Sequence, residues 1–205
     1  MLFETERIIV FISIVWAVAA LTVQAVRSRG RGRKEYAVRA GSVIQGIIYN
    51  FTWAMTPKHK ETIRLHIFEF AIGVVMHIGI FLGFIRVIQL IISPQLVRFY
   101  PMFWNFILGL SFLCSFYLFA RRIVSAELRK LSIPDDYISI LLVFGFLFMD
   151  LLTEFRQVSI SNFLIYASVL FLYVPLGKLR HALFFFLARA EYGGRMGYRG
   201  AYPTK

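Results

Sequence analysis

The sequence is poor in cysteine and in acidic residues, with one Cys and 11 Asp or Glu in 205 residues. The single thiol, Cys114, excludes an internal disulfide and a C-x-x-C metal site. The chain also lacks a phosphate-binding P-loop, a G-x-S-x-G nucleophile elbow and an H-E-x-x-H zinc helix. These absences exclude the common forms of hydrolytic and phosphoryl-transfer chemistry, and Cys114 is interpreted as a small packing residue.

Apolar residues are abundant instead, at 59% of the chain, and the mean hydropathy of +0.68 lies far above that of soluble proteins. Five apolar stretches approach the length of about 20 residues that a helix needs to cross a bilayer. They cover residues 8–26, 67–92, 103–120, 137–152 and 163–187, of which the fourth is the shortest. The sequence therefore predicts an all-α integral membrane protein, a five-transmembrane-helix bundle that forms one domain over residues 1–205.

The basic residues predict the orientation of this bundle. With five spans, 19 of the 23 Lys and Arg fall on one face, in residues 27–64, in the loop after the third span and in residues 178–205. Lys and Arg are enriched in cytoplasmic loops, so we expect the N-terminus outside, the C-terminus in the cytoplasm and a multi-pass location in the inner (cytoplasmic) membrane. The acidic leading segment MLFETER argues against a cleavable signal. A one-sided charge beside spans is explained by topology and anionic headgroups, not by nucleic acid.

Local signals predict where several helices begin and end. The pair Thr56-Pro57 places a capping residue before a first-turn proline, which predicts that the second helix begins just beyond it. Ser93-Pro94 ends that helix, and Ser132-Ile-Pro134 opens the fourth. Pro175 is predicted to kink the fifth helix. The glycine-rich residues 191–205 are predicted to be extended.

Two of the four histidines lie inside apolar stretches, where an ionisable side chain is costly and usually faces an interior or a cofactor. Each has a glycine four residues before it and a phenylalanine four residues after it. Helical side chains lean back over the surface at i−4, so each glycine is predicted to open a slot for a flat ligand, with the phenylalanine as its wall. The two sets are Gly73, His77 and Phe81 in the second stretch, and Gly177, His181 and Phe185 in the fifth.

A count along straight helices matches the depths of these histidines. At 1.5 Å per residue, His77 lies about 22 Å and His66 about 39 Å from the outer end of the second helix, and His181 about 27 Å from that of the fifth. Haem b held by two neutral imidazoles, from His77 and His181, fits this match, with His66 as the alternative ligand. The other interpretation is a pair of packed histidines, with glycines for close helix contact, because Gly79 and Gly83 have G-x-x-x-G spacing.

The segments MHIGIFLGF and VPLGKLRHALFFFLAR, together with TPKHKETIRLH and YRGAYP, carry a family resemblance. The chain resembles the gamma-subunit family of respiratory nitrate reductase, a membrane cytochrome b, and its relatives in heterodisulfide reductase and sulfate-respiration complexes. The resemblance implies five spans with the N-terminus outside. The nitrate reductase form carries two haems, but Val87 and Phe163 stand where its second pair of histidines would be expected, so the resemblance implies a single haem here.

Further polar residues are assigned roles on the same basis. Lys178 and Arg180 flank His181 and are predicted to contact the haem propionates, or else to snorkel to the interface. Arg86, Asp150 and Glu154 are the polar candidates for a quinone site or a proton exit, or else they mark helix ends.

These features predict an electron-transfer subunit of a quinone-linked oxidoreductase complex, not an enzyme that acts alone. The chain would anchor the complex in the membrane and pass electrons between the quinone pool and a cytoplasmic iron–sulfur or flavin subunit, through haem iron held by His77 and His181. The alternative is a haem-free structural anchor of a cytoplasmic complex. A transporter is disfavoured, because the sequence has no pair of broken helices in corresponding halves.

Overall fold

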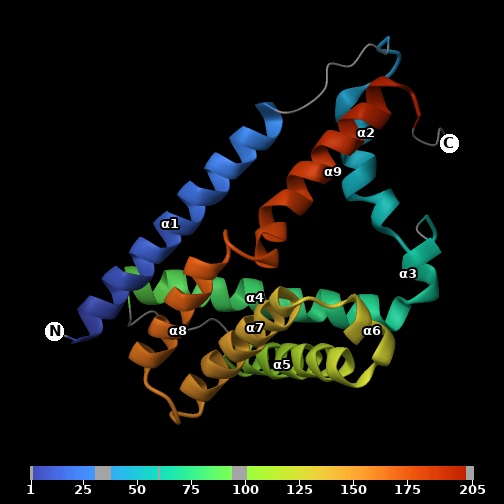
Figure 1. Cartoon of the computed structure of the whole chain (residues 1–205). Helices are drawn as coiled ribbons and strands as arrows, with labels where there is room; N and C mark the ends of the chain where they lie inside the picture. The colour runs from blue at the N-terminus through green and yellow to red at the C-terminus, as the bar shows by residue number, and fades with distance from the viewer. Residues whose placement is uncertain (1, 31–37, 60, 94–100, 202–205) are drawn as a thin grey trace. The chain divides into compact units, whose positions relative to one another are not determined.

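The computed structural model describes residues 2–30, 38–59, 61–93 and 101–201, and every regular element in these ranges is a helix. Figure 1 shows the helices in chain order. They are α1 (Leu2–Gly30), α2 (Val43–Phe51), η1 (Trp53–Met55), α3 (Glu61–Leu65), α4 (Ile67–Ile92), α5 (Pro101–Val124), α6 (Ala126–Leu131), α7 (Pro134–Glu154), α8 (Ile160–Tyr173), η2 (Lys178–Arg180) and α9 (His181–Tyr198).

Four of these helices, α1, α4, α5 and α7, are long and apolar enough to cross a membrane. A fifth span exists only if α8 and α9 are counted together across the break between them. The predicted all-helical, multi-pass membrane protein is therefore confirmed, and the kink predicted at Pro175 is confirmed as a break between α8 and η2 within the fifth stretch. Pro175 lies in the break, because proline donates no backbone hydrogen bond and clashes with the preceding turn.

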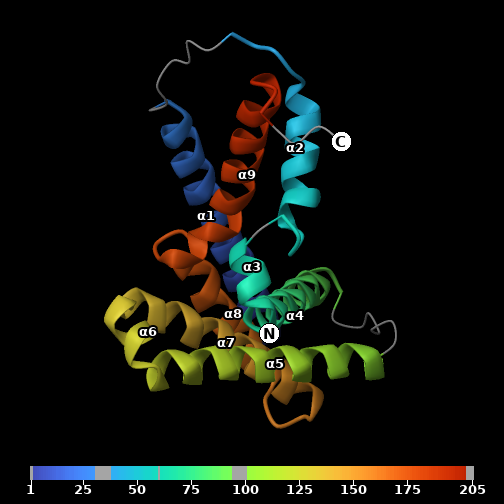
Figure 2. The same cartoon turned by 90° about the vertical axis from the view of Figure 1, so that its right-hand side faces the viewer.

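The single domain expected from the sequence divides by contacts into two compact units. Unit 1 contains residues 1–20 and 69–179, and unit 2 contains residues 21–68 and 180–205. In unit 1, α5 lies beside α7, and α7 packs on α8 (Figures 1 and 2). Val10 of α1 belongs to the buried core of this unit, and two side chains of α1 add hydrogen bonds: Trp16 Nε1 donates to the Leu172 carbonyl at 3.3 Å, and Arg7 Nε donates to the Ile91 carbonyl at 3.0 Å.

The core of unit 1 follows from helical spacing. On α7, Val143, Phe146, Leu147 and Asp150 recur at the intervals that place residues on one face of a helix, and all four are buried. On α4, glycine makes the closest packing. A Cβ built at Gly79 would overlap the Ser111 side chain, and one at Gly83 would lie 2.5 Å from Phe146 Cε1. The G-x-x-x-G spacing thus serves close helix contact in this unit.

Most of the predicted helix boundaries in the described residues are confirmed, and one was wrong. α4 ends at Ile92 before Ser93, and α7 begins at Pro134, where the Asp136 carboxylate accepts a hydrogen bond from the Ile133 N–H at 3.0 Å. The second helix does not begin just after Thr56-Pro57. The Thr56 hydroxyl instead hydrogen-bonds His59 Nδ1 at 2.9 Å, which stabilises a local turn before the short α3 and the start of α4.

Unit 2 is held together by α2 and α9, which lie side by side (Figures 1 and 2). A Cβ built at Gly46 would overlap the Gly193 carbonyl oxygen, and one at Gly197 would overlap that of Ser42. The prediction of an extended glycine-rich tail was therefore wrong for residues 191–198. Glycine weakens an isolated helix, but here it lets two backbones approach, and the packing outweighs the propensity.

A polar contact fixes the register of this pair. Asn50 is 2% exposed, and its side-chain nitrogen donates to the Arg189 carbonyl at 2.6 Å. The Arg189 guanidinium returns a hydrogen bond to Asn50 Oδ1 at 2.7 Å and also contacts the Met55 sulfur. Since both partners are satisfied only in this register, the network positions α2, η1 and α9 together.

Gly46→Ala tests the close contact of α2 with α9. Because the added methyl overlaps a backbone carbonyl, we expect a loss of about 1–3 kcal/mol in the free energy that protects these helices. Amide hydrogen exchange of α2 and α9 measures it. Gly194→Ala is the matched control, because its Cβ would make only ordinary side-chain contacts, at 3.4 Å with Val43 and 3.9 Å with Ile47. Equal protection in the two variants would contradict the interpretation.

Candidate functional site: a buried ionic cluster and the histidines

The ionic cluster of unit 1 joins α4 to α7 through Arg86. Its Nε lies 3.2 Å from Asp150 Oδ1, its Nη1 pairs with Glu154 Oε1, and its Nη2 donates to Thr153 Oγ1 at 2.9 Å. The Thr153 hydroxyl in turn donates to the Asp150 carbonyl at 2.7 Å. One guanidinium therefore bridges two carboxylates and a hydroxyl, a geometry to which the planar fork of arginine is suited.

Burial makes this cluster costly to disrupt. Asp150 is fully buried, and the side chains of Arg86 and Glu154 are 8% and 18% exposed. The Phe163 ring of α8 covers the guanidinium at 5.8 Å from ring centroid to Cζ. Charges removed from water are tolerated where they are paired and hydrogen-bonded, so this cluster fixes α4 against α7.

The sequence had singled out Arg86, Asp150 and Glu154, and the structure brings all three together. Sequence reasoning missed Thr153 and Phe163. A hydroxyl three residues after Asp150 on a helix was the available signal for Thr153. Phe163 had no such signal, because its position over the guanidinium depends on how α8 packs.

His77 lies within α4 and is exposed on the surface of unit 1. Its Nδ1 donates to the Gly73 carbonyl oxygen at 2.6 Å, because a carbonyl can only accept. This bond fixes the tautomer in which Nε2 carries the lone pair, which is the usual arrangement of a metal-ligating histidine. A Cβ built at Gly73 would meet nothing within 4 Å, so space lies beside this glycine. Phe81, one turn further along α4, is 55% exposed.

The fifth stretch differs from this arrangement. A Cβ built at Gly177 would lie 2.5 Å from the Tyr173 ring and 2.6 Å from Asp135 Oδ1. The predicted slot beside Gly177 was wrong, because these two side chains fill it. The depth count for His181 also fails, since it assumed a straight helix and the chain leaves helical geometry after Tyr173.

A second polar cluster secures this break in unit 1. The Tyr173 hydroxyl donates to Asp135 Oδ1, and the Lys178 N–H donates to Asp135 Oδ2 at 2.9 Å. Lys178 Nζ pairs with Asp136 Oδ2 at 2.7 Å, while Arg122 lies 3.3 Å from the other oxygen. Asp135 thus accepts one backbone N–H that a continuous helix would have paired with a carbonyl, and Asp136 pairs with side-chain cations beside the break. They also engage the lysine assigned to a propionate.

The remaining predicted residues lie in unit 2 and are exposed or partly exposed. His181 is exposed at the start of α9, Arg180 precedes it, and His66 is exposed at the junction of α3 and α4. Phe185 stacks beneath the Arg189 guanidinium at 5.6 Å. Their roles in binding a cofactor stay predictions from the sequence.

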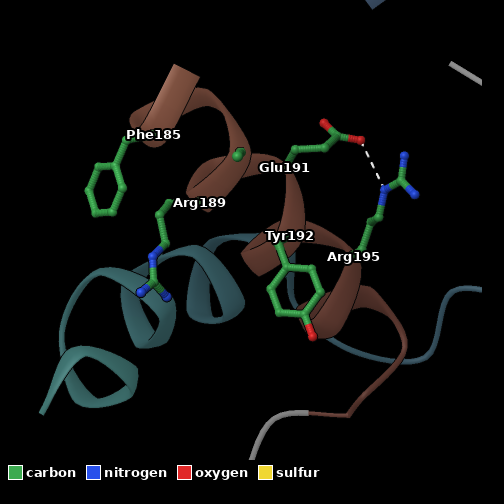
Figure 3. A pocket seen from close by; sticks show the side chains of 6 residues that line it. Phe185, Arg189, Glu191, Tyr192 and Arg195 are labelled. Carbon is green, nitrogen blue, oxygen red and sulfur yellow. Dashed lines mark hydrogen bonds and ion pairs between the residues drawn. The ribbon is translucent and has the colours of Figure 1, made fainter. Parts of the chain in front are cut away.

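An open groove of about 490 Å³ runs along α9 in unit 2 (Figure 3). Its two arginines are already engaged: Arg195 pairs with Glu191 at 3.1 Å, and Arg189 points toward α2. The groove is also lined by the rings of Phe185 and Tyr192. The residues are Phe185, Ala188, Arg189, Glu191, Tyr192 and Arg195.

Comparison with known proteins adds no relative. No family model, no curated protein and no solved structure matches the chain. The fold is that of an all-helical, multi-pass membrane protein with a buried ionic cluster and a second polar cluster at the break after α8. The resemblance to the membrane cytochrome b family stays a prediction from sequence.

Arg86→Leu tests the buried cluster. Removing the guanidinium takes the bridging cation from two carboxylates, so we expect a loss of about 3–5 kcal/mol in the free energy of unfolding. Denaturant titration of the purified protein in micelles measures it. Arg121→Leu is the control, because its pair with Glu69 is partly exposed and is worth at most about 1 kcal/mol. Similar losses in both variants would show that the buried ionic cluster stabilises the protein no more than a partly exposed ion pair does.

Proposed function

We propose that this chain is the membrane-anchoring cytochrome b subunit of a larger oxidoreductase. It passes electrons between the membrane quinone pool and a cytoplasmic iron–sulfur or flavin subunit. The observation that carries the proposal is the state of His77 on α4, an exposed imidazole in an apolar helix whose ring is already oriented by a backbone carbonyl.

An imidazole on the surface of an apolar span is expensive unless something polar covers it. The Gly73 carbonyl satisfies Nδ1 and directs the ring's other nitrogen away from its own backbone. The space beside Gly73 would be available to a flat macrocycle edge, since no atom beyond the local helix backbone lies within 4 Å of the Cβ position. These properties fit an axial ligand better than a histidine packed against a neighbouring helix.

Haem b supplies reversible one-electron chemistry when bound. In this proposal, His77 and His181 would hold the iron as neutral imidazoles, and the apolar surface of the surrounding helices would exclude water. Arg180 remains the predicted propionate contact. For Lys178, the pair with Asp136 favours a structural role at the helix break.

His66 stays the alternative ligand. His77 was preferred because its depth matched that of His181 along a straight fifth helix. The break after Tyr173 invalidates that comparison of depths. Absorption spectra of the histidine variants therefore distinguish His66 from His77 as the ligand.

The basic residues support docking of a soluble redox partner. Unit 2 contains 14 of the 23 Lys and Arg and three of the 11 Asp and Glu. An excess of one sign attracts an oppositely charged surface and speeds its association. An acidic cytoplasmic subunit would use this attraction.

The absorption spectrum of the purified protein tests the proposal. In the wild type we expect the absorption band of haem b in its reduced state. The band should be lost in His77→Ala and in His181→Ala, because each variant removes a predicted iron ligand. His59→Ala is the control and should keep the band, since His59 lies in an exposed turn and bonds Thr56.

Two other outcomes are informative. If His66→Ala abolishes the band and His77→Ala keeps it, the cytochrome stands but the ligand assignment moves to His66. If the wild type shows no band after expression with haem supplied, the cytochrome proposal fails and the chain is a haem-free anchor.

A further inference from the structure

We propose that α2 is an interfacial helix that binds anionic lipid headgroups. Its outer face inserts into the cytoplasmic leaflet, and the basic residues around it pair with lipid phosphates. This inference goes beyond the proposed electron transfer and does not depend on haem.

The two faces of α2 differ in burial: one packs against α9 and the other is exposed. Ser42, Gly46 and Asn50, four residues apart, face α9, where glycine contact and the Arg189 network hold them. The opposite side exposes apolar side chains: Ile44 is 70% exposed and Ile48 is 56% exposed. Because α9 covers the first face, the apolar face of α2 lies on the surface of unit 2.

Aromatic residues continue the apolar surface beyond α2. Trp53 of η1 is 60% exposed, and the Phe51 ring stacks on Phe186 of α9 at 6.2 Å, with Phe186 itself 49% exposed. Tryptophan is enriched at the boundary between headgroups and acyl chains, because its ring is amphipathic. An exposed tryptophan that follows two exposed isoleucines closely in the chain is therefore typical of a helix that lies in the interface.

Chain connectivity keeps α2 close to a bilayer. The helix follows the apolar α1 by 12 residues and precedes the apolar α4 by 15 residues. Since both neighbours qualify as membrane spans, α2 is tethered at both ends to the same leaflet. An apolar face held at the membrane surface gains free energy by entering the headgroup region.

Charge selects the lipid. The excess of Lys and Arg in unit 2 exceeds what its three acidic residues can neutralise, whichever pairs form within the unit. Arg39 and Lys58, at either end of the α2–η1 segment, are both exposed. Each basic residue near an anionic leaflet adds electrostatic attraction to the lipid phosphates. Apolar insertion combined with this excess favours anionic lipid over a soluble acidic protein as the occupant of this face.

Trp53 fluorescence in full-length protein tests the proposal. Trp16→Phe and Trp104→Phe leave Trp53 as the single reporter of the three tryptophans. In nanodiscs that contain phosphatidylglycerol, we expect strong quenching by lipids brominated near the headgroup and weak quenching by aqueous acrylamide. Quenching by brominated lipid should fall in purely zwitterionic nanodiscs. Samples are matched in haem content, so that energy transfer to any haem cancels.

Two sets of variants separate the contributions. Ile44→Gln with Ile48→Gln should reduce quenching by brominated lipid in both kinds of nanodisc, because insertion is lost. Arg39→Gln with Lys58→Gln should reduce it only in anionic nanodiscs. Gln45→Asn, on the same helix, is the matched control and should change neither.

Trp53 that is quenched by acrylamide in every nanodisc, and unaffected by brominated lipid, would overturn the proposal. Protection of Trp53 only after a soluble partner is added would also overturn it, because the face would then dock protein. The haem spectrum is unaffected by either result, so this inference and the cytochrome proposal fail independently.

Discussion

A guanidinium placed among apolar helices must be paired, and this requirement organises unit 1. Arg86 reaches Asp150, Glu154 and Thr153 on α7 and lies under the Phe163 ring of α8. Hydrophobic packing alone tolerates sliding of one apolar helix along another, whereas an ion pair with fixed donor directions does not. The ionic cluster therefore sets the register in which the apolar residues of α4 and α7 meet.

Glycine provides the second constraint, and its effect depends on what faces it. Gly83 admits the Phe146 ring, and Gly46 admits the backbone of α9. Gly177 admits Tyr173 and Asp135 at the break after α8. Gly73 alone of these four has open space beside it, next to the imidazole of His77. The same residue type thus serves close packing at three positions and has no neighbouring side chain or helix within 4 Å of its Cβ position at the fourth.

The two units differ in charge, and this difference joins the two proposals. Unit 1 has nearly balanced charges and contains α5, α7 and most of α1 and α4, whereas unit 2 has most of the basic excess. A membrane electron carrier needs an apolar environment for its cofactor and a charged surface where soluble partners arrive. An α2 face bound to anionic lipid would hold that charged unit at the membrane surface, within reach of such partners.

The sequence by itself determined the membrane class, the helix ends at Ser93 and Pro134, and the three members of the buried cluster. These follow from local rules: hydropathy, capping chemistry and the rarity of charge in apolar segments. Only the tertiary structure decided that Gly177 is filled, that residues 191–198 are helical and that α2 pairs with α9. Each of these depends on which side chain or backbone lies opposite a glycine, and that neighbour is far away in the sequence.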